Sequence, residues 1–181
     1  MFSLRAIEEE DLEFIREIRN DKDLYQFLGT FEIISKRKQI KWFESLQNDD
    51  SKMYLIFEKY GFDEEEKKQN PLPNIRKKLG YVRVTQIDKI NMSICVGGDI
   101  QKGYRGKGYG KEMYKLIFDL CFNKLNMNRV WLFVLENNER AINLYTKMGF
   151  KEEGRQRKAI FKNGNYFDYV MMSILKDEYK L

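Results

Sequence analysis

A segment of ten residues, Gln101–Gly110 (QKGYRGKGYG), contains four glycines and separates two apolar stretches. Glycine has no Cβ, so successive backbone N–H groups in such a loop can converge on an anion. The loop leads into residues 109–125, whose apolar spacing predicts a helix, and the positive end of that helix adds to the attraction. Arg105, Lys107 and Lys111 supply side-chain charge. The sequence therefore predicts an anion-binding turn at the start of a helix.

Two familiar phosphate-binding motifs do not fit this loop. A Walker A loop needs Lys and then Ser or Thr after its second glycine, but Tyr109 and Gly110 follow Gly108. A Rossmann fingerprint needs a third glycine or alanine at a place held here by Lys111 or Met113. On these residues alone, a turn that only joins a strand to a helix remains the alternative.

The 181 residues include no histidine and two cysteines, which excludes several classes of chemistry. Ser-His-Asp and Cys-His catalysis need histidine, and Cys/His zinc sites need more ligands than two cysteines provide. Cys95 and Cys121 fall in a predicted strand and a predicted helix, so we expect buried free thiols. Any chemistry then depends on Tyr, Asp, Glu, Lys, Ser, Cys or backbone amides, and we expect no metal.

Charge and hydropathy point to a cytoplasmic protein with no membrane partner. Apolar runs such as Arg129–Leu135 (RVWLFVL) are too short to span a bilayer. The start of the chain turns acidic by Glu8, which is typical of neither a secretory leader nor a basic transit peptide. The net charge of +5 suits a partner with a few phosphates but does not require nucleic acid.

Predicted strands and helices alternate, with antiparallel hairpins at both ends, which indicates a single domain (residues 1–181) of mixed α/β class. Two early helices are expected from apolar residues at helical spacing, Leu12, Ile15 and Ile18 in the first and, after the candidate N-cap Ser35, Ile40, Phe43 and Leu46 in the second. Residues 61–78 are charged and contain both prolines, so we expect a mobile hairpin insertion, a loop without function being the alternative. Asn163-Gly164 predicts a tight hairpin turn.

Two segments resemble motifs of the GCN5-related N-acetyltransferases, the GNAT family. Arg105–Gly110 is similar to the R/Q-x-x-G-x-G/A loop that holds the pyrophosphate of acetyl-CoA, and Asn138–Phe150 (NERAINLYTKMGF) is similar to the family's N-x-x-A-x-x-x-Y-x-x-x-G-F segment. The resemblance implies a mixed, mostly antiparallel sheet of about seven strands flanked by about four helices. It also implies acetyl-CoA as acetyl donor, with cofactor-binding residues Ile100, Arg105, Gly106, Lys107, Gly108, Tyr109, Gly110, Lys111 and Asn138.

The resemblance implies direct attack of an amine on the thioester, so no Ser or Cys nucleophile is needed. Tyr145 matches the family's acid position and would protonate the leaving thiolate, whose pKa is roughly 8.5. Some members carry a glutamate as base where this chain has Phe133. Asp99 is our first candidate for the base and Glu136 the second, with a water relay as the alternative.

The acceptor amine is the least constrained part of the prediction. The N-terminal third and the C-terminal segment are similar to the branch containing ribosomal-protein, spermidine and nucleotide-amino-sugar acetyltransferases. Within that branch, the N-terminal third is most similar to acetyltransferases of nucleotide-linked amino sugars, which we expect as the acceptor. The basic residues Lys36–Lys38 and Lys41 with Trp42 would suit its diphosphate, a solvated helix face being the alternative. A protein N-terminus or a polyamine is the alternative. The net charge disfavours spermidine, although local carboxylates could override it.

A different class of function, RNA binding, has one partial motif in its favour. Lys107–Gly110 with Tyr114 resembles part of an RNA-recognition signature. That signature continues with Phe and Val on a central strand, whereas Lys111 and Glu112 are expected to open a helix. We therefore expect no nucleic-acid partner and a small-molecule amine as substrate. A homodimer is the oligomeric state left open.

Overall fold

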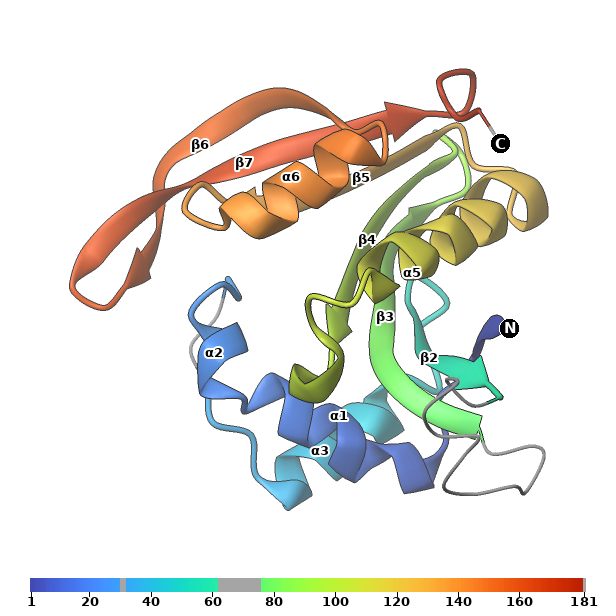
Figure 1. The fold of residues 1–181 in the computed structure, drawn as a ribbon, viewed down its shortest axis with the longest axis vertical. Helices are drawn as coiled ribbons and strands as arrows, with labels where there is room; N and C mark the ends of the chain where they lie inside the picture. Colours follow the sequence, from blue (N-terminus) through green and yellow to red (C-terminus); the bar gives the residue numbers. More distant parts are fainter. Residues whose placement is uncertain (30–31, 62–75, 181) are drawn as a thin grey trace.

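The computed structural model describes residues 1–29, 32–61 and 76–180, which form one sheet with helices on both faces (Figure 1). The sheet has the order β1-β2-β3-β4-β5-β7-β6. Its strands are β1 (Phe2–Ala6), β2 (Met53–Tyr60), β3 (Arg76–Asp88), β4 (Ser93–Ile100), β5 (Arg129–Leu135), β6 (Lys151–Lys162) and β7 (Asn165–Leu175). Only β4 and β5 are parallel; the other neighbours are antiparallel. The expected mixed, mostly antiparallel α/β fold is confirmed.

The helices are α1 (Leu12–Arg19), α2 (Lys22–Tyr25), α3 (Lys36–Ser45), α5 (Tyr109–Phe118) and α6 (Glu139–Lys147). Short turns of 3-10 helix cover Glu9–Asp11 and Lys102–Tyr104, and a π-helical turn, Asp119–Lys124, continues α5. The single helix expected over residues 109–125 is thus α-helical in its first part and π-helical in its second. None of the helices in the described ranges is long and apolar enough to span a membrane.

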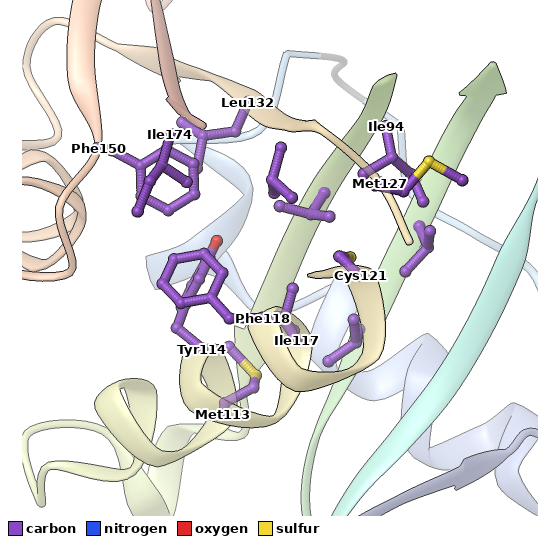
Figure 2. Close-up of a cluster of buried hydrophobic side chains, with 14 of the residues drawn as sticks. Ile94, Met113, Tyr114, Ile117, Phe118, Cys121, Met127, Leu132, Phe150 and Ile174 are labelled. Carbon is purple, nitrogen blue, oxygen red and sulfur yellow. The ribbon is translucent and has the colours of Figure 1, made fainter. Parts of the chain in front are cut away.

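The larger apolar core lies between the sheet and α5 with its π-helical extension. Figure 2 shows Met113, Tyr114, Ile117 and Phe118 of α5 facing side chains of the strands. A smaller core on the opposite face joins Ile15 and Ile18 of α1 to Ile56 and Tyr81 of the sheet. Both stripes follow the helical spacing in the sequence, because residues three and four apart share one side of a helix.

The apolar side of α3 differs from the prediction. Ile40 is 45% exposed, while Gln39 is buried, and Trp42, Phe43 and Leu46 lie partly buried on the same side as Gln39. The buried side therefore has the spacing i, i+3, i+4, i+7 counted from the polar residue Gln39. Hydropathy alone thus placed Phe43 and Leu46 correctly, but it included Ile40 and excluded Gln39. Ser35 does cap α3, its Oγ accepting a hydrogen bond from the Lys38 N–H at 3.2 Å.

The sequence predicted two hairpin regions, one around Asn163-Gly164 and one at residues 61–78, and the first prediction agrees better with the structure. Asn163 and Gly164 have φ of +49° and +83° and form the β6–β7 turn, as their sequence predicts. Of the insertion predicted at residues 61–78, residues 62–75 lie outside the described residues. Arg76–Lys78, which we assigned to the insertion, belong to β3. The cysteines are free thiols, with Cys121 buried and Cys95 partly buried.

One interruption of the sheet positions the site. β4 and β5 are paired only over Ser93–Cys95 opposite Arg129–Trp131. Beyond these pairs the two strands continue without hydrogen bonds to each other, to Ile100 and Leu135 respectively. These two strand ends, each still paired with its outer neighbour, surround the same region of the molecule together with the glycine loop and the start of α6 (Figure 1).

Candidate active site

Two cavities meet where β4 and β5 are no longer paired with each other. The first, of about 770 Å³, extends along the glycine loop and the starts of α5 and α6. The second, of about 340 Å³, lies between α2, α3 and the strands β2, β3, β5 and β7. Six residues line both, namely Leu24, Phe27, Gly98, Asp99, Asn138 and Tyr145. We call the first the cofactor cavity, the second the acceptor cavity and the shared residues the junction.

The glycine loop has the shape that an anion site requires. Gly106 and Gly108 have φ of +83° and +82°, a conformation that residues with a Cβ rarely adopt. A Cβ added at either would meet no atom within 4 Å, so the space beside the backbone is open. Gly108 is the N-cap of α5, whose first N–H groups have no intrahelical partners. A bound diphosphate fits this open, amide-lined turn.

Most predicted cofactor residues line the cofactor cavity. They are Ile100, Arg105, Gly106, Gly108, Gly110, Lys111 and Asn138. Lys107 and Tyr109 are not among its lining residues. The Lys107 Nζ lies 5.7 Å from the centre of the Tyr104 ring, and the Tyr109 ring packs against Phe2 and Tyr104.

Two of these residues have structural partners of their own. A Cβ on Gly110 would lie 3.0 Å from a methyl carbon of Leu144, so this glycine lets α5 approach α6. The Asn138 Oδ1 accepts a hydrogen bond from the Ala141 N–H at 3.2 Å and caps α6. Asn138 can still offer its amide nitrogen to a ligand, because the cap uses only the oxygen.

Tyr145 lies at the junction, where a transferred group would pass from one cavity to the other. Its ring packs edge-on against Tyr114, with ring centres 5.3 Å apart, and tilted against Phe150, with ring centres 5.7 Å apart. Burial raises the pKa of the Tyr145 hydroxyl, so the group is protonated at neutral pH. This position and protonation state suit a proton donor.

Asp99, also at the junction, is held by Arg83 from the neighbouring strand. The register places Arg83 opposite Gly97, and a Cβ there would lie 2.8 Å from an Arg83 nitrogen. The missing side chain lets the guanidinium lie across β4, where it forms an ion pair with Asp99 and donates a hydrogen bond to the Tyr81 hydroxyl at 2.8 Å. Burial alone would lower the pKa of Arg83, but Asp99 and Tyr81 raise it well above its usual value.

Aromatic rings make up much of the acceptor cavity. Its lining includes Phe27, Trp42, Tyr54, Tyr81, Phe133 and Tyr169. Phe133, which holds the place of a glutamate in some relatives, stacks on Tyr169 at 4.7 Å. Arg19 also lines the cavity, lies 5.6 Å from the centre of the Trp42 ring, and forms no ion pair with the described residues.

Two groups of residues that the sequence suggested for the site do not line the cavities, apart from Trp42. Lys36, Arg37, Lys38 and Lys41 are exposed on the solvent side of α3, and only Trp42 of that cluster reaches the acceptor cavity. Glu136, our second candidate base, lies outside both linings, and its Oε1 accepts a hydrogen bond from the Asp168 N–H at 2.8 Å. Within the described ranges, no group of three or more Cys, Asp or Glu side chains could hold a metal ion.

Sequence reasoning missed several lining residues. Arg83 and Tyr81 lie on β3 and reach Asp99 only through cross-strand pairing, which no local motif reveals. Leu24 lies in the short helix α2 and Phe27 just after it, and this segment has no apolar repeat. A usable signal was Gly97-Gly98 in a strand, since glycine in a strand often marks the close approach of another group.

Comparisons with known proteins show the family of the chain. A family model for the acetyltransferase (GNAT) domain matches residues 2–151. Spermidine N(1)-acetyltransferase of Vibrio cholerae is 27% identical over 177 residues, which cover 98% of this chain and 94% of the relative. The enzyme of the same name from Escherichia coli K12 is 27% identical over 176 residues, covering 97% and 87%.

The crystal structure of the Vibrio cholerae spermidine N-acetyltransferase in complex with CoA and spermine has the same fold. Its TM-score to this chain is 0.85 at 25% identity, covering 98% of this chain and 96% of that one. The chain belongs to the GNAT family, and it is an acyltransferase that moves an acetyl group from acetyl-CoA to an amine.

Proposed function

We propose that the chain acetylates a primary amine of an aliphatic polyamine of the spermidine class. The observation that carries this proposal is the similarity to spermidine N(1)-acetyltransferases, which extends over nearly the whole chain, the acceptor cavity included. The relatives thus favour the alternative acceptor over the nucleotide-linked amino sugar that the sequence first favoured. The basic face of α3, one of the reasons for that sugar, points to solvent.

The lining of the acceptor cavity is compatible with an alkylammonium chain. Faces of Trp, Tyr and Phe rings attract cations and also contact methylene groups. Trp42, Tyr54 and Phe133 supply such surfaces, and Asp99 supplies a carboxylate at the junction. The overall charge of +5 therefore says little about the charge that a bound amine meets.

In the proposed reaction, the backbone amides of Gly106–Gly110 hold the pyrophosphate of acetyl-CoA, which supplies an acetyl thioester at the junction. A neutral amine attacks the carbonyl carbon, the carbon–sulfur bond breaks, and Tyr145 gives its proton to the departing sulfur. Asp99 lies where it can receive the amine proton directly or through water. Because the Asp99 carboxylate is already paired with Arg83, we expect the amine to lose its proton mainly to solvent.

A second candidate acceptor is an amine that also carries an anionic group, such as a nucleotide-linked amino sugar. The observation in its favour is Arg19, which lines the acceptor cavity without an ion-pair partner among the described residues. An unpaired guanidinium binds phosphate or carboxylate well. Arg19 also repels a polycation, so the two candidates predict opposite effects of removing it.

The test is a coenzyme-release assay with spermidine, UDP- and dTDP-linked amino sugars, and peptides with ribosomal-protein N-termini. We expect spermidine to have the highest kcat/KM, and Arg19→Met to raise that value by a few-fold through the loss of repulsion, on the order of 1 kcal/mol. A sugar nucleotide turned over a hundredfold faster than spermidine, with activity lost in Arg19→Met, would overturn the polyamine proposal in favour of the second candidate.

A further inference from the structure

The segment Asp21–Gly29, which contains α2, forms part of the wall between the two cavities. Leu24 and Phe27 line both cavities, and Leu28 and Gly29 line the acceptor cavity alone. In Figure 1, α2 lies between the glycine loop and the β6–β7 hairpin. The position of this one segment therefore sets the shape of both cavities.

The front end of the segment is attached to the glycine loop. Asp21 Oδ2 lies 2.7 Å from Arg105 Nη1, and both side chains are largely buried, at 12% and 16% exposure. The other oxygen, Asp21 Oδ1, accepts a hydrogen bond from the Asp23 N–H at 2.9 Å and caps α2. Arg105 Nε in turn donates to the Ile100 carbonyl oxygen at 2.8 Å. Arg105 therefore joins the end of β4 to the start of α2.

A second, more exposed ion pair also joins α2 to the segment after β4. Lys102 Nζ is 2.6 Å from Asp23 Oδ2, but these side chains are 71% and 58% exposed. Exposed pairs contribute little because water screens them, whereas breaking a buried pair leaves a charge without its partner. The Asp21–Arg105 pair is thus the stronger of the two connections.

The far end of the segment is fixed to a different part of the molecule. Lys162 Nζ of β6 donates a hydrogen bond to the Tyr25 carbonyl oxygen at 3.2 Å. A Cβ on Gly29 would lie 3.2 Å from the Tyr169 hydroxyl of β7, so this turn packs closely on the sheet. Movement of the segment is therefore expected mainly at its front end, beside Arg105.

We propose that Asp21 is a positioning residue, which transmits the state of the glycine loop to the acceptor cavity through Arg105. Arg105 directly precedes Gly106, whose backbone we assign to the cofactor. Occupation of the loop would fix Arg105, hold Asp21, and set Leu24 and Phe27 at the junction. Such coupling is reciprocal, so an amine in the acceptor cavity would tighten cofactor binding by the same factor. The inference rests on the acetyl-CoA site of the proposed mechanism, and it is independent of which amine is acetylated.

The first test uses hydrogen exchange and CoA alone, with no acceptor. In the wild-type protein, saturating CoA should slow exchange of the amides in residues 21–29 by about tenfold, a typical coupling. Asp21→Asn keeps an efficient N-cap but removes the charge, so CoA should bind and the added protection should be lost. Asp23→Asn, which breaks only the exposed pair, should keep the protection. Arg105→Gln, as a second variant, should lose it as Asp21→Asn does.

The second readout is kinetic. Asp21→Asn should raise KM for the acceptor by about tenfold. At a low acceptor concentration, its KM for acetyl-CoA should stay within a few-fold of the wild-type value. Protection retained in Asp21→Asn, or lost equally in Asp23→Asn, would overturn the assignment to Asp21. Failure of CoA to bind the wild type would be a separate result, which would remove the cofactor site and the coupling with it.

Discussion

At the scale of single residues, two polar residues of the junction each have a close neighbour that is not part of it. Tyr145 and Asp99 line both cavities, Arg83 pairs with Asp99, and Tyr114 lies beneath Tyr145. Burial raises the pKa values of Tyr145 and Tyr114 together. Both hydroxyls are therefore protonated at neutral and mildly alkaline pH, so Tyr145 carries the proton that an acid would give to the leaving sulfur.

The first prediction is the pH dependence of catalysis. Since the pKa of Tyr145 is raised above its ordinary value of 10, its proton is lost only above that pH. The value of kcat/KM should rise with pH as the amine deprotonates, with no falling limb between about pH 7 and 9.5. The measurement is coenzyme release over that range. A decline that begins near pH 8 would assign the acid to another group.

Sequence reasoning located the junction residues unevenly. Tyr145 and Asn138 lie on α6 at fixed spacing within one motif, so their nearness to the glycine loop followed from the family resemblance. Asp99 was chosen as a polar residue near a strand end, and it does line the junction. Arg83 could not be found, because its reach to Asp99 depends on strand register and on the absence of a side chain at Gly97.

At the scale of secondary-structure elements, the loop between β4 and α5 matters most. Gly106 and Gly108 are both in the left-handed region, and the loop ends where the N–H groups of α5 begin. The sequence indicated this arrangement because glycines and a helix start occur together. It did not indicate the π-helical end of α5 or the polar residue on the buried side of α3, since tertiary packing decides both.

The second prediction concerns Gly108. Gly108→Ala places a Cβ in the open space beside the loop and strains a backbone with φ of +82°. We expect acetyl-CoA affinity, measured by calorimetry, to fall by at least about tenfold. Gly164→Ala is the matched control, because Gly164 has φ of +83° in the β6–β7 turn, far from the loop. Its strain of about 1 kcal/mol should lower stability without changing affinity. Equal affinities in both variants would contradict the loop assignment.

At the scale of the whole molecule, a buried ionic network ties the first three strands together. Asp11 accepts hydrogen bonds from Arg5 at 2.6 and 2.9 Å, and Lys78 lies 2.6 Å away. Arg5 also pairs with Glu58 on β2. Burial alone would raise the pKa of Asp11, but hydrogen bonds from Arg5, Lys78 and the Glu8 N–H lower it to about 2.

The third prediction follows from the sign of that shift. A carboxyl group with a lowered folded-state pKa stabilises the protein above its unfolded pKa of about 3.9, and the contribution is lost as pH falls toward 2. The free energy of unfolding should therefore drop by about 2 kcal/mol from this group alone between roughly pH 5 and pH 2. Denaturant titrations should show a smaller drop in Asp11→Asn, from a lower starting stability. Parallel curves for the two proteins would exclude Asp11 as the cause.

The molecule as a whole places its chemistry where two cavities meet, and Tyr145 is the group that we assign to proton transfer there. Tyr169 offers a matched comparison, because it is a tyrosine of the same enzyme that lines the acceptor cavity but not the cofactor cavity. Burial raises its pKa too, so a difference in function between the two must come from position.

The most direct test is to compare Tyr145→Phe with Tyr169→Phe, using acetyl-CoA and the acceptor that the amine panel shows to be turned over fastest. Loss of a general acid should lower kcat of Tyr145→Phe by about 10²–10⁴-fold, with acetyl-CoA affinity nearly unchanged. Tyr169→Phe should keep kcat within a few-fold of wild type and change mainly KM for the acceptor. Full turnover by Tyr145→Phe, or equal losses of kcat in both variants, would contradict the assignment of the acid to the junction.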